Sequence, residues 1–151
     1  MLDASVIIDL SALKCLELAF GLADNVYIPQ RLFNKELEQD VKSELNSLTC
    51  EVRPVTTSQG LLLFAELART KKLSEYDRET IVLAKEVGAC CATNDGKMRD
   101  ACDRYGIEKT GTLGILGNAK DGGMISVTRL KELCVVYQGL PGCRLSVELI
   151  N

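Results

Sequence analysis

The chain alternates short apolar runs with longer segments in which apolar residues recur every three or four positions. Val6, Leu10 and Leu13 show this spacing within residues 5–18, which predicts an amphipathic helix there. Further helices are expected over residues 58–69, 74–87, 96–105, 113–120 and 127–136. Short strands are expected over residues 1–4, 26–28, 51–55, 89–93 and 107–109.

This order of elements predicts an α/β fold. Strands that alternate with helices favour a parallel sheet covered by helices on both faces. Pro29 follows the strand at 26–28 and is well placed to open the next helix, because its φ angle is already helical. No linker or internal repeat divides the 151 residues, so a single domain spanning 1–151 is expected. The pattern assigns no element to residues 140–151.

Composition narrows the chemistry that the protein could perform. The sequence contains no histidine, which excludes Ser-His-Asp and Cys-His catalysis and histidine-based metal sites. An enzyme of this composition would depend on carboxylates, cysteine, lysine or a bound metal. Carboxylate oxygens without imidazole suit hard cations such as Mg²⁺ and Mn²⁺. The net charge of −3 gives no overall sign of nucleic-acid binding.

The cysteines and the apolar runs suggest a cellular location. The seven cysteines are odd in number and contain no C-x-x-C pair, which is typical of buried thiols in a reducing compartment. No apolar run is long enough to span a membrane, and no basic segment precedes the apolar residues near Met1. We therefore expect a cytoplasmic protein without a membrane anchor.

Three aspartates stand where the fold would bring them together. Asp3 lies near the end of the first expected strand, Asp95 follows the strand at 89–93, and Asp77 lies in the first turn of the helix at 74–87. Asp77 and Asp95 are 18 positions apart, enough for a helix, a glycine turn and a returning strand. Because parallel strands end at one edge of a sheet, we expect the three acids to face one cleft. Their mutual repulsion would favour a bound cation.

Each aspartate also has a structural explanation. Asp77 fits the third position of a capping box opened by Ser74, Asp95 fits a helix N-cap, and so does Asp3. Taken singly, these explanations are the more common ones. The joint pattern is what favours a shared site.

The longest motif runs from residue 76 to residue 95 and includes Thr93-Asn94-Asp95. It resembles the central signature of PIN domains: an acid that opens a helix, an Ala/Leu-rich helix, a glycine, a strand and a T-x-D. Residues 2–8 resemble the opening D-[TA]-[SN]-hydrophobic motif of that family, and residues 111–116 resemble the G-T-L-G-[IV]-L of a VapC-like branch. The resemblance spans residues 2 to about 123 and implies a PIN-like three-layer α/β/α sandwich with a central parallel sheet.

The resemblance also implies an activity. PIN domains of this kind are metal-dependent ribonucleases, and Asp3, Asp77 and Asp95 would be catalytic acids that bind one or two Mg²⁺ or Mn²⁺ ions. Ser5 matches the small hydroxyl residue that supports the first aspartate. Such a metal activates water and offsets phosphoryl charge, and cleavage would leave a 5′-phosphate and a 3′-hydroxyl. The VapC-like branch further implies the toxin of a toxin–antitoxin pair, with RNA as substrate, a small antitoxin as partner and a homodimer as the assembly.

The fourth family acid is assigned to Glu36, as a catalytic residue. An alternative register places the family glutamate at Lys35, and one residue turns a helix by about 100°. Glu38 and Asp40 are further alternatives. Glu79 is a lesser candidate, because it lies two positions past Asp77 and so points to a different side of the same helix.

Two basic residues follow the last aspartate. Lys97 and Arg99 are expected to contact RNA phosphates near the metal centre. Asp100 and Asp103 lie on the same expected helix and would offset part of that positive charge.

Three other functions compete with a ribonuclease as explanations of the sequence. A catalytically inactive PIN-like module that binds RNA or a protein would keep the fold without the chemistry. A phosphatase of the haloacid dehalogenase type requires a second aspartate at position 5, where this chain has Ser5. Nucleotide binding at Gly111-x-x-Gly114-x-x-Gly117 does not match G-x-G-x-x-G. A tight turn and close packing explain Gly111 and Gly114 better.

Overall fold

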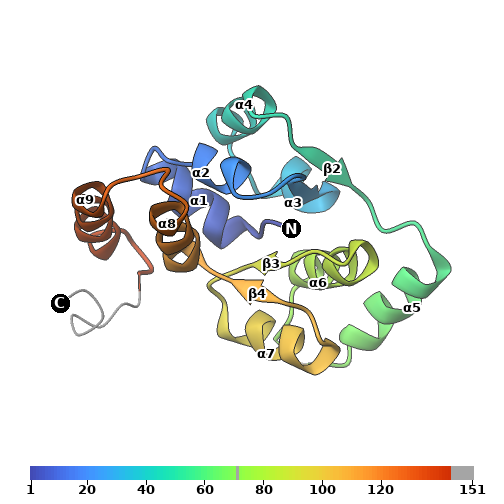
Figure 1. The fold of residues 1–151 in the computed structure, drawn as a ribbon. Coiled ribbons are helices and arrows are strands. Elements are labelled where there is room, and N and C mark those ends of the chain that lie inside the picture. Colours follow the sequence, from blue (N-terminus) through green and yellow to red (C-terminus); the bar gives the residue numbers. More distant parts are fainter. Residues whose placement is uncertain (71, 144–151) are drawn as a thin grey trace.

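The computed structural model describes residues 1–70 and 72–143 (Figure 1). The first half of this region contains α1 (Ala4–Ala12), α2 (Glu17–Gly21), β1 (Tyr27–Pro29), α3 (Gln30–Lys35), α4 (Gln39–Ser47), β2 (Glu51–Arg53) and α5 (Ser58–Leu67). The second half contains α6 (Glu75–Val87), β3 (Cys91–Ala92), α7 (Gly96–Tyr105), β4 (Lys109–Thr110), α8 (Thr112–Asp121) and α9 (Val127–Gln138). No helix in the described ranges is both long and apolar enough to cross a membrane.

The strands form one parallel layer that is joined in the middle by residues 1 and 2. β1 pairs with β2, and β3 pairs with β4, both in parallel. The backbone N–H of Leu2 donates to the carbonyl of Tyr27 (2.9 Å), and that of Ala92 donates to the carbonyl of Met1 (2.8 Å). Leu2 also forms a parallel bridge with Ala92. The strand expected over residues 1–4 is therefore only a single bridge, but it has the predicted position and direction.

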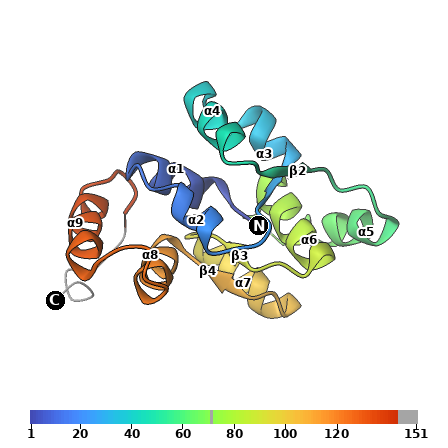
Figure 2. The same ribbon diagram turned by 45° about the horizontal axis from the view of Figure 1, so that its top comes forward.

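Neighbouring residues in this layer point to opposite faces, and each face has its own core. Met1 and Cys91 pack in the core beneath α5, α6 and α7. Leu2 and Ala92 pack in the other core, with α1, α2 and α8. This is the period-two alternation of extended chain. The predicted three-layer α/β/α arrangement with a central parallel sheet is thus confirmed, and Figures 1 and 2 show α1 and α7 on opposite sides of β3 and β4.

The helix predicted over residues 5–18 is interrupted. α1 ends at Ala12 and α2 begins at Glu17, and between them Lys14 has a φ of 53°, which an α-helix does not allow. The prediction was wrong here because Leu13 and Leu16 are both buried on either side of the turn. The apolar spacing therefore continues across the break.

Other differences have equally local causes. α4 was not predicted, although Val41, Leu45 and Leu48 recur at helical spacing in and beside it and pack on the core. β4 begins at Lys109, two residues later than the strand expected over 107–109. Of the unassigned segment 140–151, residues 144–151 lie outside the described part of the chain.

The two helices that flank β3 have the ends that were predicted. Ser74 caps α6, and Gly88 ends it with a φ of 63°. α7 spans Gly96–Tyr105 and is stopped by Gly106, with a φ of 65°. These left-handed glycines end helices at little steric cost. Asp77 lies in the first turn of α6, and Asp95 is the N-cap of α7.

Candidate functional site

Asp3 is the most buried of the predicted acids. It lies between residues 1–2 and α1, and it is 5% exposed. The hydroxyls of Ser5 and Thr93 donate to its Oδ2 at 2.7 and 2.9 Å. Burial raises the pKa of Asp3, the two hydroxyl hydrogen bonds oppose that rise, and the negative charge of Asp77 adds to it. Although Asp3 occupies the N-cap position of α1, its side chain makes no capping hydrogen bond.

Thr93 connects Asp3 to Asp95. The Thr93 hydroxyl donates to Asp3 and accepts from the backbone N–H of Asp95 at 3.2 Å. Asp95 itself caps α7, because its Oδ1 accepts from the backbone N–H groups of Lys97 (2.9 Å) and Met98 (3.0 Å). The end of β3 is thereby fixed against the start of α1. Asp95 has the structural role that the sequence allowed, and its backbone is connected to Asp3 through the Thr93 hydroxyl.

Asp77 also has two roles. It completes the capping box of α6: its Oδ2 accepts from the Ser74 backbone N–H at 2.7 Å, and its own N–H donates to the Ser74 hydroxyl at 3.1 Å. At the same time its charge acts on the neighbouring acids, raising the pKa of both Asp3 and Glu36. The capping box therefore holds the carboxylate in place near the other acids.

Glu36 lies at the C-cap of α3 and faces the same group of acids. Partial burial raises its pKa, and the charges of Asp3 and Asp77 raise it further. The structure thus brings Asp3, Glu36 and Asp77 into one electrostatic neighbourhood, with Asp95 joined to it through Thr93.

The donor set suits a hard divalent cation. Hydrogen bonds within the described residues engage only Oδ2 of Asp3, Oδ2 of Asp77 and Oδ1 of Asp95. No described lysine or arginine forms an ion pair with these three acids. Between residues 1 and 143, residue 71 excepted, no three acid or cysteine side chains are gathered closely enough to hold one ion. One or two carboxylates, completed by water and substrate phosphate, is the arrangement that Mg²⁺ commonly uses.

Glu79 has a different function from the other acids. It is 2% exposed, and its Oε2 accepts from the backbone N–H of Arg31 at 3.0 Å. Burial raises the pKa of Glu79, while backbone N–H groups of Arg31 and Val55 oppose that rise. Glu79 therefore fastens α6 to the start of α3, the helix that carries Glu36.

Sequence reasoning missed a polar network beside the acids. The side-chain amide of Asn94 donates to Asp9 and to the Thr112 hydroxyl, both at 2.8 Å, and its Oδ1 accepts from the Thr112 N–H at 3.0 Å. The Asn94 backbone N–H donates to the Ser5 hydroxyl at 3.2 Å. Asn94 and Thr112 both belong to motifs that the sequence displays. Their contact joins α8 to the loop that carries Asp95.

The two predicted RNA-binding cations differ in their surroundings. Nη1 of Arg99 donates to the backbone carbonyls of Thr93 (3.1 Å) and Thr110 (3.0 Å), so this side chain holds the ends of β3 and β4 together. Lys97 is an exposed residue in the first turn of α7. Arg99 has a positioning role that the sequence did not indicate.

Gly111 and Gly117 form a matched pair for testing the packing of the G-T-L-G motif. A Cβ at Gly111 would lie 2.6 Å from Asn94 Oδ1 and 3.4 Å from the Thr93 carbonyl, whereas one at Gly117 would meet nothing within 4 Å. We expect Gly111→Ala to lose about 1–3 kcal/mol of unfolding free energy. Gly117→Ala should gain about 0.5–1 kcal/mol, because alanine favours the helix. Urea denaturation measures both, and equal effects would contradict the predicted crowding.

Comparison with known proteins identifies the family of this chain. A family model described as PIN domain matches residues 1–151. No curated protein matched the sequence. The family match covers every element that positions the acids, from the strand bridge at Leu2 to α9. The chain therefore belongs to the PIN domain family.

Proposed function

We propose that this protein is a metal-dependent ribonuclease that hydrolyses RNA phosphodiester bonds. PIN domains are in general nucleases, and the finer assignment rests on the acids of this chain. Asp3, Asp77 and Asp95 would hold Mg²⁺ or Mn²⁺, and Glu36 would be the fourth catalytic acid. Ser5 would support Asp3 through the hydrogen bond to Oδ2.

One observation carries the proposal. Asp3 is buried without a lysine or arginine partner among the described residues, and burial and the charge of Asp77 both raise its pKa. Proteins almost never bury such a carboxylate unless a cation or several donors compensate its charge. Two hydroxyls donate to one oxygen of Asp3 and the charge of Asp77 acts on the same carboxylate, so a divalent cation would offset the repulsion between these acids.

The roles of the side chains follow from their contacts. A bound divalent cation supplies an activated water and offsets charge on the phosphoryl oxygens. Ser5 and Thr93 orient Asp3, the capping box orients Asp77, and the start of α7 orients Asp95. Glu36, with its raised pKa, is suited to accept a proton at its carboxylate during attack by water.

The test is cleavage of total RNA in the presence of Mn²⁺. Wild type should shorten the RNA, and Asp77→Asn should leave it largely intact, because the substitution removes one metal-binding charge. Asp100→Asn is the matched control, since it makes the same change at an exposed position on α7 outside the acid group. Identical RNA profiles for wild type and Asp77→Asn would refute the nuclease proposal.

An inactive PIN-like module that binds RNA or a protein partner is the second candidate. The observation in its favour is that the described residues gather no three acids around one point. The same assay separates the two candidates, because an inactive module would leave RNA uncut by wild type and variant alike. The toxin role, the small antitoxin partner and the homodimer, which follow from the VapC-like motif, stay predictions.

A further inference from the structure

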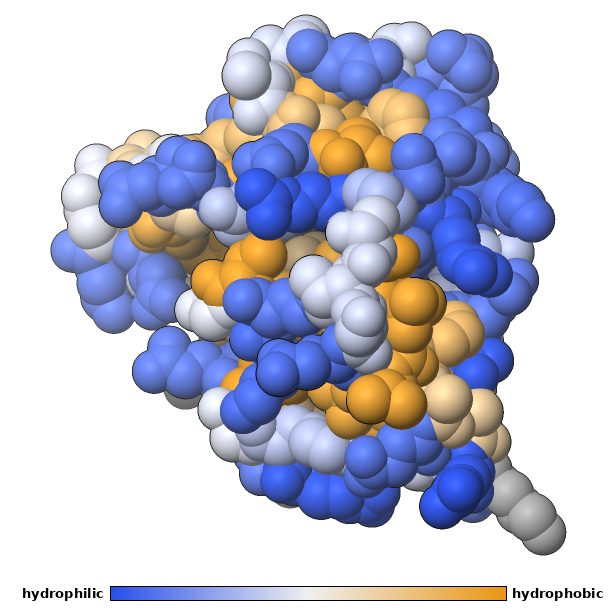
Figure 3. Space-filling model, turned by 90° about the vertical axis from the view of Figure 1, so that its right-hand side faces the viewer, coloured by the Kyte–Doolittle hydropathy of each residue, from blue (hydrophilic) through white to orange (hydrophobic). Residues whose placement is uncertain are grey.

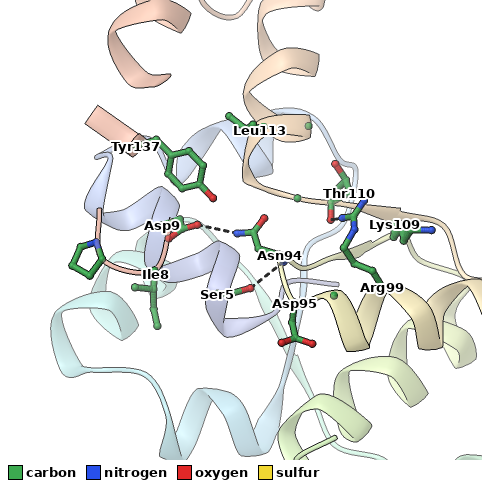
Figure 4. Close-up of a pocket in the computed structure, with 15 residues that line it drawn as sticks. Ser5, Ile8, Asp9, Asn94, Asp95, Arg99, Lys109, Thr110, Leu113 and Tyr137 are labelled. Atoms are coloured by element: carbon green, nitrogen blue, oxygen red, sulfur yellow. Dashed lines mark hydrogen bonds between the residues drawn. The ribbon is translucent and has the colours of Figure 1, made fainter. Parts of the chain in front are cut away.

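An open pocket of about 730 Å³ lies directly beside the acid group (Figure 4). Its lining comes from α1, the turn between β3 and α7, β4, the start of α8, the end of α9 and the residues after it. Ser5 and Asp95 line the pocket and also belong to the proposed centre. Figure 4 shows the Asp95 carboxylate turned away from Asn94.

The polar side of the pocket has opposite charges at its two ends. Asp9 lies at one end, Arg99 and Lys109 lie at the other, and Asn94 lies between them (Figure 4). Only Nη1 of Arg99 has acceptors among the described residues, which leaves the Nε and Nη2 hydrogens for a ligand. Lys109 adds charge at the same end, where its Nζ also pairs with Asp103. A phosphate would therefore bind at the Arg99 end, away from Asp9.

The remaining side of the pocket is apolar. Ile8, Leu113 and Pro141 line it together with the ring of Tyr137. Ile8 is 50% exposed, which is high for an isoleucine in a helix that packs on the core. An apolar side facing a cationic end suits a nucleotide, whose base is flat and largely apolar on its faces while its phosphate is anionic.

Asn94 cannot read a base in this pocket. Both hydrogens of its amide and its carbonyl oxygen are engaged by Asp9 and Thr112. Base-specific contacts by asparagine need that amide to be free. The pocket would therefore accept a nucleotide by its shape and phosphate, with little preference for the base.

We propose that this pocket binds one nucleotide of a single-stranded RNA next to the bond that is cut. Its phosphate lies toward Arg99 and Lys109, and its base packs on Ile8 and Leu113. The identity of the ligand as RNA rests on the proposed ribonuclease function, whereas the location rests on the pocket. The strand passes from the acids over Asp95 into the pocket.

The test compares two substitutions that add the same charge at exposed positions. Ile8→Asp places a carboxylate in the pocket. Leu62→Asp places a carboxylate outside the pocket, on α5, where Leu62 is 72% exposed. Figure 3 shows apolar residues at the surface on a different face of the molecule. Binding of a labelled short single-stranded RNA is measured by fluorescence anisotropy in a metal chelator, so that cleavage plays no part. Ile8→Asp should weaken binding roughly tenfold, because it replaces the apolar contact with the base by a hydrated carboxylate, and Leu62→Asp should bind as wild type does.

The outcomes for the pocket and for the proposed activity are distinct. Equal affinities of Ile8→Asp and Leu62→Asp, or no RNA binding by wild type, would overturn the pocket assignment whatever the cleavage assay shows. A selective loss in Ile8→Asp without any Mn²⁺-dependent cleavage by wild type would retain the pocket and reject the nuclease. Thermal melting followed by circular dichroism verifies that both variants are folded, since neither change removes a buried side chain.

Discussion

Replacing Asp3 by asparagine is expected to abolish Mn²⁺-dependent RNA cleavage and to make the metal-free protein more stable. Loss of a metal ligand removes several kcal/mol of transition-state stabilisation, so the rate should fall at least about a hundredfold. Asparagine retains an oxygen that accepts from Ser5 and Thr93 but removes a buried negative charge beside Asp77. Each kcal/mol by which this change increases the free energy of unfolding should raise Tm by roughly 2–4 °C in a chain of this size.

The stability gain has a defined dependence on pH. Because burial raises the pKa of Asp3 above its ordinary value of 3.8, the folded protein holds this proton more tightly than the unfolded chain does. The Asp3 contribution therefore lowers the stability of wild type as pH rises from about 3.8 through the raised pKa, and it is constant above that. The Tm difference between Asp3→Asn and wild type should widen over this window. A variant less stable than wild type at neutral pH without metal would contradict the account of Asp3.

Glu36→Gln is the substitution that tests the fourth acid. Proton transfer by a positioned carboxylate typically contributes at least about a hundredfold in rate, so initial rates of RNA cleavage at saturating Mn²⁺ should fall by about that factor. Glu38→Gln is the control. Glu38 lies two residues further along, at the N-cap of α4, and its side chain makes no capping hydrogen bond.

The comparison also decides between the alternatives that the sequence left open. If Glu38→Gln loses as much activity as Glu36→Gln, the assignment of Glu36 as the fourth catalytic acid is wrong. If Glu38→Gln alone loses activity, the fourth acid is Glu38. The charges of Asp3 and Asp77 act on Glu36, which is why we expect the loss to be confined to Glu36→Gln.

Local signals in the sequence were sufficient to predict the elements that present the acids. The serine cap and the two glycine stops define α6 and α7, and the short apolar run between them defines β3. The break at Lys14 could not be predicted, because burial continues across it. A repeating apolar pattern reports which side of the chain is buried and not whether the backbone stays helical.

The positions of the acids along the chain were predictable, but their supports were not. Asp3 depends on Thr93, which is 90 positions away, and Thr112 contacts Asp9 over 103 positions. One sequence contains no record of such pairings. Glu79 shows the same limit, since an acid in an apolar helix becomes interpretable only when its acceptor role toward Arg31 is seen.

The insertion of residues 1 and 2 between β1 and β3 has a consequence for how the chain folds during synthesis. One partner of this segment, Tyr27, emerges early, but its other partner, Ala92, emerges only after 92 of the 151 residues have been made. Pairings at such long range close slowly, because the loop entropy must be lost before the contacts form. We therefore expect the two cores to form cooperatively at a late stage, with Asp3 reaching its hydroxyl partners in that same step.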